Sequence, residues 1–216
     1  MTQLVFHHDI NQLNNLQNGT IPVHLYGMGN KNLQIAHIGN MVLDRVRRLG
    51  IRLNNQVMDF LTIAMAVTAA DTFVLRKDTA NGWCRSFSIT LPLCQPAIWQ
   101  ANKVHLEHIL HFLSGDIWQF DFQENGQNPP QPYSQNGRTK LVDLRNKDCV
   151  CLFSGGLDSS IGAIDLLEQG HSPVLVSHSY KGDKSRQQAI IQQLNQNGYI
   201  LSLIHISEPT RPEPIS

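Results

Sequence analysis

The sequence predicts an α/β protein with two parts, an N-terminal α+β domain and the truncated start of a domain built on a parallel sheet. Strand and helix patterns mix in the first 122 residues, a polar stretch follows, and a strand–loop–helix–strand order begins at residue 149. Of the 216 residues, 41% are hydrophobic, which is ordinary for a folded protein. The 17 basic and 17 acidic residues give no bulk charge that would attract nucleic acid or an anionic membrane.

Residues 1–122 carry the patterns of a compact α+β domain, whose role the sequence does not indicate. The runs "LVFHH" and "IPVHLYG" predict an opening hairpin or two neighbouring strands. A helix is predicted from Asn54, which fits an N-cap. Its core-facing positions are expected at helical spacing, on Val57, Phe60, Leu61, Ala64, Met65 and Thr68.

The rest of this domain is predicted as strand, helix and strand. In "WCRSFSITLPL" a period of two predicts a strand with one buried face. Pro96 fits the first turn of the next helix, because the backbone amide that proline lacks would have no partner there. Gly115 fits the end of this helix, because glycine readily adopts a left-handed backbone conformation. The run "IWQFDFQ" predicts the last strand.

Residues 123–137 are expected to be a linker. The text "QENGQNPPQPYSQN" is rich in Pro, Asn and Gln and offers few side chains to bury. The second domain then covers residues 138–200. Within it, "VCLF", "SIGAIDLLEQG" and "PVLVSHS" predict a βαβ unit, which crosses over into a parallel sheet.

The loop "SGGLDSS" between the first strand and the helix predicts an anion site. Gly155 and Gly156 let the backbone turn and approach an anion closely, and the free amides of a helix start favour negative charge. Asp158 would repel bare phosphate, so it is expected either to hold Mg²⁺ or to cap the helix. The loop lacks the lysine of GxxxxGK[ST] and does not match GxGxxG.

These residues resemble the SGGxDS signature of the PP-loop ATP pyrophosphatases, whose fold is of the adenine nucleotide alpha hydrolase-like type. Such enzymes cleave ATP to AMP and pyrophosphate and adenylate a carbonyl or carboxyl oxygen before a nitrogen or sulfur nucleophile displaces AMP. The resemblance implies a pyrophosphate-binding loop made by Ser154, Gly155, Gly156, Leu157, Asp158, Ser159 and Ser160. It also implies that the adenosine lies near the end of the next strand, at Val176, Ser177 and His178. Asp158 is the expected catalytic residue and Mg²⁺ partner.

The layout of the whole chain is similar to the 7-cyano-7-deazaguanine synthase-like (QueC-like) proteins of the Qat anti-phage system. This resemblance implies a bacterial ligase with ATP and Mg²⁺ as cofactors, a small-molecule or protein substrate, and defence-system proteins as partners. True synthases of the queuosine pathway carry "YGQ" after the second strand, where this chain has "SHSYKGDKSRQQ". Their four-cysteine zinc site has no counterpart in these residues, so zinc is expected only in a missing C-terminal part.

Two alternatives stay open. Asparagine synthetase-type enzymes also carry "SGGLDSS", but the N-terminal cysteine nucleophile of their glutaminase domain is absent, since Thr2 follows Met1. The other alternative is a nucleotide-binding or scaffolding subunit that has the same loop but does not catalyse a reaction.

The final segment, residues 201–216, is expected to be non-native. The stretch "LSLIHISEPTR" resembles the in-frame translation of a transposase-type sequencing adapter. The alternative is a genuine third strand followed by a proline-rich end. If the tail is an adapter product, the parallel sheet is incomplete, and we expect this fragment to be inactive although its parent is an enzyme.

The remaining features favour a cytoplasmic protein. The N-terminus lacks the pattern of a secretory signal, and no apolar run has the length of a membrane span. Cys84, Cys94, Cys149 and Cys151 lack zinc-knuckle or CxxC spacing and are expected to be reduced and structural.

Overall fold

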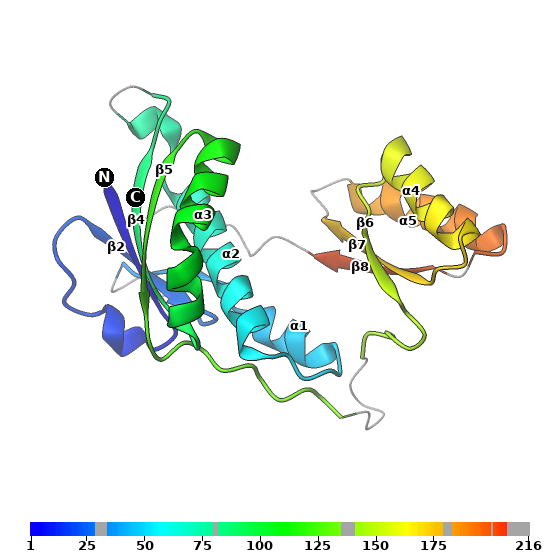
Figure 1. Cartoon of the computed structure of the whole chain (residues 1–216), viewed down its shortest axis with the longest axis horizontal. Helices are drawn as coiled ribbons and strands as arrows, with labels where there is room; N and C mark the ends of the chain where they lie inside the picture. The colour runs from blue at the N-terminus through cyan, green and yellow to red at the C-terminus, as the bar shows by residue number, and fades with distance from the viewer. Residues whose placement is uncertain (29–33, 80–81, 135–140, 179–182, 200, 207–216) are drawn as a thin grey trace. The chain divides into compact units, whose positions relative to one another are not determined.

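The computed structural model describes residues 1–28, 34–79, 82–134, 141–178, 183–199 and 201–206 (Figure 1). The chain divides into two compact units, one within residues 1–139 and the other within residues 140–208. The expected linker and domain boundary fall between the last strand of the first unit and the first strand of the second. Among the described residues, none of the helices combines the length and the apolar character that a membrane span requires.

The first unit is built on a five-stranded sheet in the order β3-β2-β1-β4-β5, in which every neighbouring pair is parallel. The strands are β1 (Thr2–His7), β2 (Thr20–Leu25), β3 (Ala36–Ile38), β4 (Ser86–Pro92) and β5 (Ile117–Gln123). The sheet therefore belongs to the α/β class, and the expected α+β class of this unit is wrong. The opening hairpin is also wrong, although β1 and β2 are neighbours as expected.

The one-sided burial of this sheet explains the wrong class. Parallel strands are usually buried on both faces and read as continuous apolar runs. In β5, however, Trp118, Phe120 and Phe122 are buried while Gln119 and Asp121 between them are exposed. Such alternation is typical of antiparallel sheets, so the pattern predicted the strands correctly, and with them the single buried face of β4, but favoured the wrong fold class for this unit.

The expected start of one long helix of this unit and both expected limits of the other are confirmed. Helix α2 (Asn55–Phe73) begins where the Asn54 side chain accepts a hydrogen bond from the Val57 amide at 2.8 Å. Helix α3 (Pro96–Ser114) has Pro96 in its first turn and ends at Gly115, whose φ is 72°. The short helices are η1 (Ile10–Leu13), α1 (Val42–Arg48) and η3 (Arg76–Asp78).

The expected buried face of α2 is mostly wrong. Val57 and Phe60 are exposed, and Met65 is the only expected core position that is fully buried. The buried positions are Met58, Asp59, Thr62, Ile63, Met65, Ala66, Ala69 and Ala70. Apolar residues surround this helix on all sides, so their spacing could not indicate which side packs on the sheet.

A buried ionic cluster lies beside the starts of β4 and β5. The Asp116 carboxylate accepts hydrogen bonds from the Arg85 side chain at 2.6 Å and from its backbone amide at 2.8 Å, and Arg76 is a second cation at 3.0 Å. Burial alone would raise the pKa of Asp116, but the Arg85 hydrogen bonds and the two guanidinium charges hold it below its ordinary value. Asp116 is therefore an ionised partner that joins the two strand ends.

The second unit contains a three-stranded parallel sheet in the order β6-β7-β8. Its strands are β6 (Cys149–Leu152), β7 (Pro173–His178) and β8 (Ser202–Ile206), and its helices are α4 (Leu157–Glu168) and α5 (Asp183–Gln196). The expected βαβ order of β6, α4 and β7 is confirmed. A small core holds this unit together and consists of Phe153, Ala163, Leu175, Ile191 and Leu201.

Strand β8 lies in the segment that resembles adapter sequence. Its residues pair with β7 from Val174 to His178. An alternating apolar segment forms a strand whatever its origin, so the pairing does not bear on whether these residues are native. Residues 207–216 lie outside the described part of the chain.

Candidate phosphate-binding site

The loop "SGGLDSS" begins at the carboxyl end of β6. The Phe153 amide donates to the Val176 carbonyl at 2.8 Å, which extends the pairing of β6 with β7 up to the loop. Ser154 follows and is exposed, and α4 starts three residues later. Ligands of open α/β sheets bind at this edge, beyond the carboxyl ends of parallel strands.

Gly155 makes the sharp turn between strand and helix. Its φ is +80°, in the left-handed region that favours glycine. A Cβ atom at this position would also lie 2.8 Å from Cγ of Gln187. Both its dihedral angle and its close approach to α5 therefore require glycine.

Hydroxyl groups close the loop on itself. The Ser154 and Ser159 hydroxyl oxygens lie 3.0 Å apart, and the Gly156 amide donates to Ser154 Oγ at 3.3 Å. The Gly156 carbonyl accepts from Ser159 Oγ at 3.1 Å and from Ser160 Oγ at 2.8 Å. The loop is thus preformed, and the Ser160 hydroxyl donates inward to the backbone.

The first turn of α4 presents backbone amides. Gly156 occupies the N-cap position and has no side chain with which to cap the helix. The first amides of an α-helix have no partner within the helix, and those of Leu157, Asp158 and Ser159 have no recorded acceptor among the described residues. Together with the positive end of the helix dipole, these three amides form a donor set for an anion.

The side chains of this turn differ in what they can contribute. Leu157 is 75% exposed and can serve a ligand only through its backbone. Asp158 is also exposed, in the first turn rather than at the N-cap position. Its carboxylate is therefore accessible to a cation from solvent.

The end of β7 lies beside the loop. The Val176 carbonyl is the acceptor for Phe153, and Ser177 is 1% exposed with no hydrogen-bond partner for its Oγ among the described residues. His178 is the last residue of β7, and its side chain lies outside the described part. No recorded hydrogen bond joins the described side chains of this segment to the loop.

Gln187 on α5 is a loop contact that the sequence did not indicate. Its side chain is 1% exposed, and its Nε2 donates to the Ser154 carbonyl at 3.1 Å. It lies in a glutamine-rich helix that matches no motif, so only the folding of α5 onto the loop distinguishes it from its neighbours. Gln187 therefore links α5 to the first residue of the loop and packs against Gly155.

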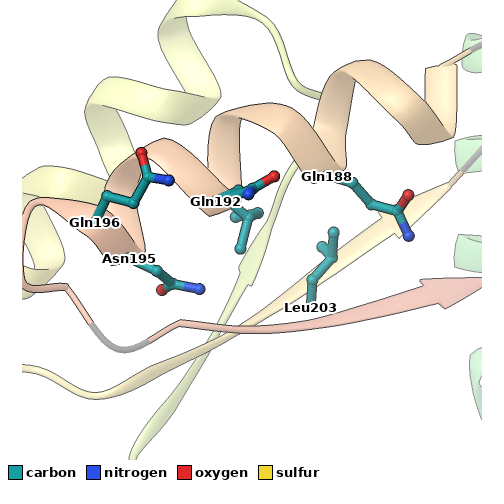
Figure 2. Close-up of a pocket in the computed structure, with 6 residues that line it drawn as sticks. Gln188, Gln192, Asn195, Gln196 and Leu203 are labelled. Atoms are coloured by element: carbon teal, nitrogen blue, oxygen red, sulfur yellow. The ribbon is translucent and has the colours of Figure 1, made fainter.

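A pocket lies between α5 and β8, and none of the loop residues 154–160 lines it (Figure 2). It is lined by Gln188, Ile191, Gln192, Asn195, Gln196 and Leu203. Leu203 belongs to the segment that resembles adapter sequence, so we assign no ligand to this pocket.

Comparison of the chain with protein-family models, with curated proteins and with solved structures gave no match.

Proposed function

We propose that residues 154–160 bind the pyrophosphate portion of ATP together with Mg²⁺. The observation that carries the proposal is the set of three first-turn amides on α4. These amides lie beyond the carboxyl end of a parallel strand, and the N-cap residue, Gly156, has no side chain that could cap them. Phosphate oxygens are acceptors of suitable charge for such a site. Gly155 keeps the approach to these amides free of a Cβ atom.

The negative charge of Asp158 means that a cation is required if phosphate binds at this site. A carboxylate beside phosphate oxygens is repulsive, whereas Mg²⁺ takes one or two carboxylates together with substrate phosphates and water. Asp158 is exposed in the same turn as the donor amides, so the metal and the phosphate can be held side by side. The residue thereby acts as the Mg²⁺ ligand in the proposal.

We infer that the loop belongs to an enzyme, a QueC-like PP-loop ATP pyrophosphatase. The enzyme would join AMP to a carbonyl or carboxyl oxygen of its substrate and release pyrophosphate, with phage defence as its setting. The supports are the SGGxDS residues and the βαβ placement of the loop. The adenosine would lie towards Val176, Ser177 and His178, at the end of the adjacent strand.

Binding without turnover is the second candidate. Asp158 is the only ionisable side chain within residues 154–160, so the loop by itself holds a nucleotide without providing an acid–base pair. Release of AMP and pyrophosphate by an intact parent would establish the enzyme, and tight ATP binding without either product would establish the binding subunit.

The proposal predicts that Asp158→Asn removes the effect of Mg²⁺ on ATP binding. The matched control is Asp165→Asn, which removes an exposed carboxylate from the same helix two turns away. In equilibrium titrations, Mg²⁺ should strengthen ATP binding to the unmodified chain and to Asp165→Asn by about tenfold or more, which corresponds to about 1.4 kcal/mol. An equal Mg²⁺ response in Asp158→Asn would remove this residue from the site.

A further inference from the structure

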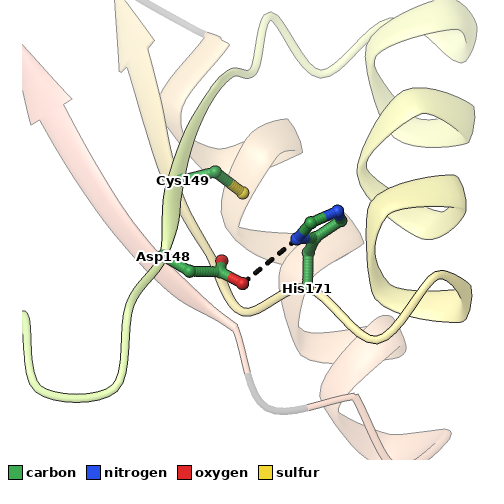
Figure 3. A group of neighbouring side chains, drawn as sticks. All are labelled: Asp148, Cys149 and His171. Atoms are coloured by element: carbon green, nitrogen blue, oxygen red, sulfur yellow. Dashed lines mark hydrogen bonds and ion pairs between the residues drawn. The ribbon is translucent and has the colours of Figure 1, made fainter.

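A second group of polar side chains lies at the opposite edge of the second sheet, where β6 and β7 begin. Asp148 immediately precedes β6, Cys149 is the first residue of β6, and His171 lies two residues before β7 (Figure 3). One ligand atom from each residue, a carboxylate oxygen, the thiol sulfur and an imidazole nitrogen, lies within 4.8 Å of the other two. The phosphate loop lies at the carboxyl end of β6, so the two groups are separate.

Backbone pairing holds this group in place. The Asp148 amide donates to the Ser172 carbonyl at 3.3 Å, and the Ser172 amide donates back to Asp148 Oδ1 at 2.8 Å. The other carboxylate oxygen, Oδ2, lies 3.1 Å from His171 Nδ1. The carboxylate of Asp148 and the imidazole of His171 are therefore oriented towards each other before any ligand arrives. Cys149, the first residue of β6, follows Asp148 in the chain.

The chemistry of the three donors selects the class of metal. Thiolate sulfur, imidazole nitrogen and carboxylate oxygen are the ligands of Zn²⁺, whereas Mg²⁺ and Ca²⁺ prefer oxygen alone. Three protein ligands leave the fourth tetrahedral position to water. The side chains of Asp148 and His171 are about half exposed, 49% and 48%, so an ion can reach them from solvent.

We propose that Asp148, Cys149 and His171 form a binding site for a Zn²⁺-type ion at the amino edge of the β6–β7 pair. A positive charge beside the group is that of Lys147, whose Nζ donates a hydrogen bond to Ser172 Oγ at 3.3 Å. This cation and the open fourth position make the site weaker than a closed four-ligand zinc site. The ion joins two segments that are far apart in sequence and stabilises the start of the parallel pair.

The test uses Co²⁺ as a probe of the untagged full chain. Tetrahedral Co²⁺ bound to a thiolate gives a charge-transfer absorption that histidine and carboxylate ligands do not give. The chain should develop this absorption, Zn²⁺ should remove it because Zn²⁺ binds such donors more tightly than Co²⁺, and Cys149→Ser should abolish it. The matched control is Cys151→Ser, on the same face of β6 and outside the group, which should leave the absorption unchanged.

Either of two results overturns the proposal: no thiolate absorption on addition of Co²⁺, or equal absorption in Cys149→Ser. If circular dichroism shows that Cys149→Ser does not fold, His171→Asn decides. Loss of the imidazole should weaken Co²⁺ binding by about tenfold or more, and unchanged affinity would exclude His171 and with it the site. ATP binding is not part of this test, so its outcome is independent of the proposed function.

Discussion

At the scale of single residues, Gly155 is the position on which the phosphate loop depends most. Its φ of +80° and the 2.8 Å approach of a hypothetical Cβ to Gln187 exclude larger side chains. The same turn joins β6 to the first turn of α4, whose amides form the proposed donor set. A change at this position therefore tests whether the loop conformation produces the binding site.

Gly155→Ala should lose most ATP binding and also destabilise the second unit. The left-handed backbone alone costs alanine about 1–2 kcal/mol, and the contact with Gln187 adds to it. Isothermal titration and thermal unfolding measure the two effects. The matched control is Gly162→Ala in α4, where a Cβ meets no atom within 4 Å and should stabilise the helix by about 0.5–1 kcal/mol. Equal ATP affinity in Gly155→Ala would contradict the site.

Several residues could be interpreted from sequence because their roles are local. Asn54, Pro96 and Gly115 determine helix ends through contacts within a few residues, and all three were predicted correctly. Gln187 and His171 could not be found in this way, because α5 and the βαβ crossover bring them to their partners. All four cysteines are free thiols as expected. The spacing of the cysteines along the chain could not show that Cys149 lies near the His171 side chain.

At the scale of elements, a buried carboxylate joins α2 to α3. Asp59 on α2 is 1% exposed and accepts from the amides of Cys94 and Gln95 at 2.7 and 2.9 Å. It also accepts from Trp99 Nε1 at 3.2 Å. Gln95, the N-cap residue of α3, provides no side-chain cap, so Asp59 supplies that function from another helix.

Asp59→Ala should lower the free energy of unfolding of the first unit by about 3 kcal/mol. The substitution leaves three partly buried donors without their acceptor, and each such loss is costly. Urea unfolding followed by circular dichroism measures the change. Asp121→Asn, an exposed carboxylate on β5, serves as the control and should alter stability by less than about 0.5 kcal/mol. A similar small effect for Asp59→Ala would show that solvent satisfies those donors.

The elements also show why sequence patterns predicted the positions of the strands but not whether neighbouring strands pair in parallel or antiparallel. Alternation depends on whether one face of a strand is exposed, and it does not record the direction of the neighbouring strand. In the first unit a parallel sheet is buried on one face, so β4 and β5 resemble antiparallel strands in sequence. The βαβ order of the second unit was predictable because a helix between two short apolar strands favours a parallel pair.

At the scale of the whole molecule, the chain consists of two units with separate hydrophobic cores. The core of the first unit contains side chains from all five of its strands and from α2, whereas five buried residues form the core of the second. Because buried apolar area is the main source of stability, the second unit should be the weaker one.

The two units should unfold in separate transitions. All three tryptophans, Trp83, Trp99 and Trp118, lie in the first unit, so their fluorescence reports on that unit alone. Circular dichroism reports on the helices of both units. In urea, the dichroism should begin to change at a lower concentration than the fluorescence, and coincident curves would contradict independent units.

The proposed phosphate site is tested most sharply by finding where ATP binds. Backbone amide resonances of the full chain, followed by NMR during titration with ATP and Mg²⁺, report binding residue by residue. If ATP binds at the loop, the largest shifts will occur at the amides of residues 155–160, with smaller shifts at the end of β7. Shifts centred elsewhere, such as on α5 and β8 around the pocket of Figure 2, or the absence of any shift at saturating ATP, would contradict it.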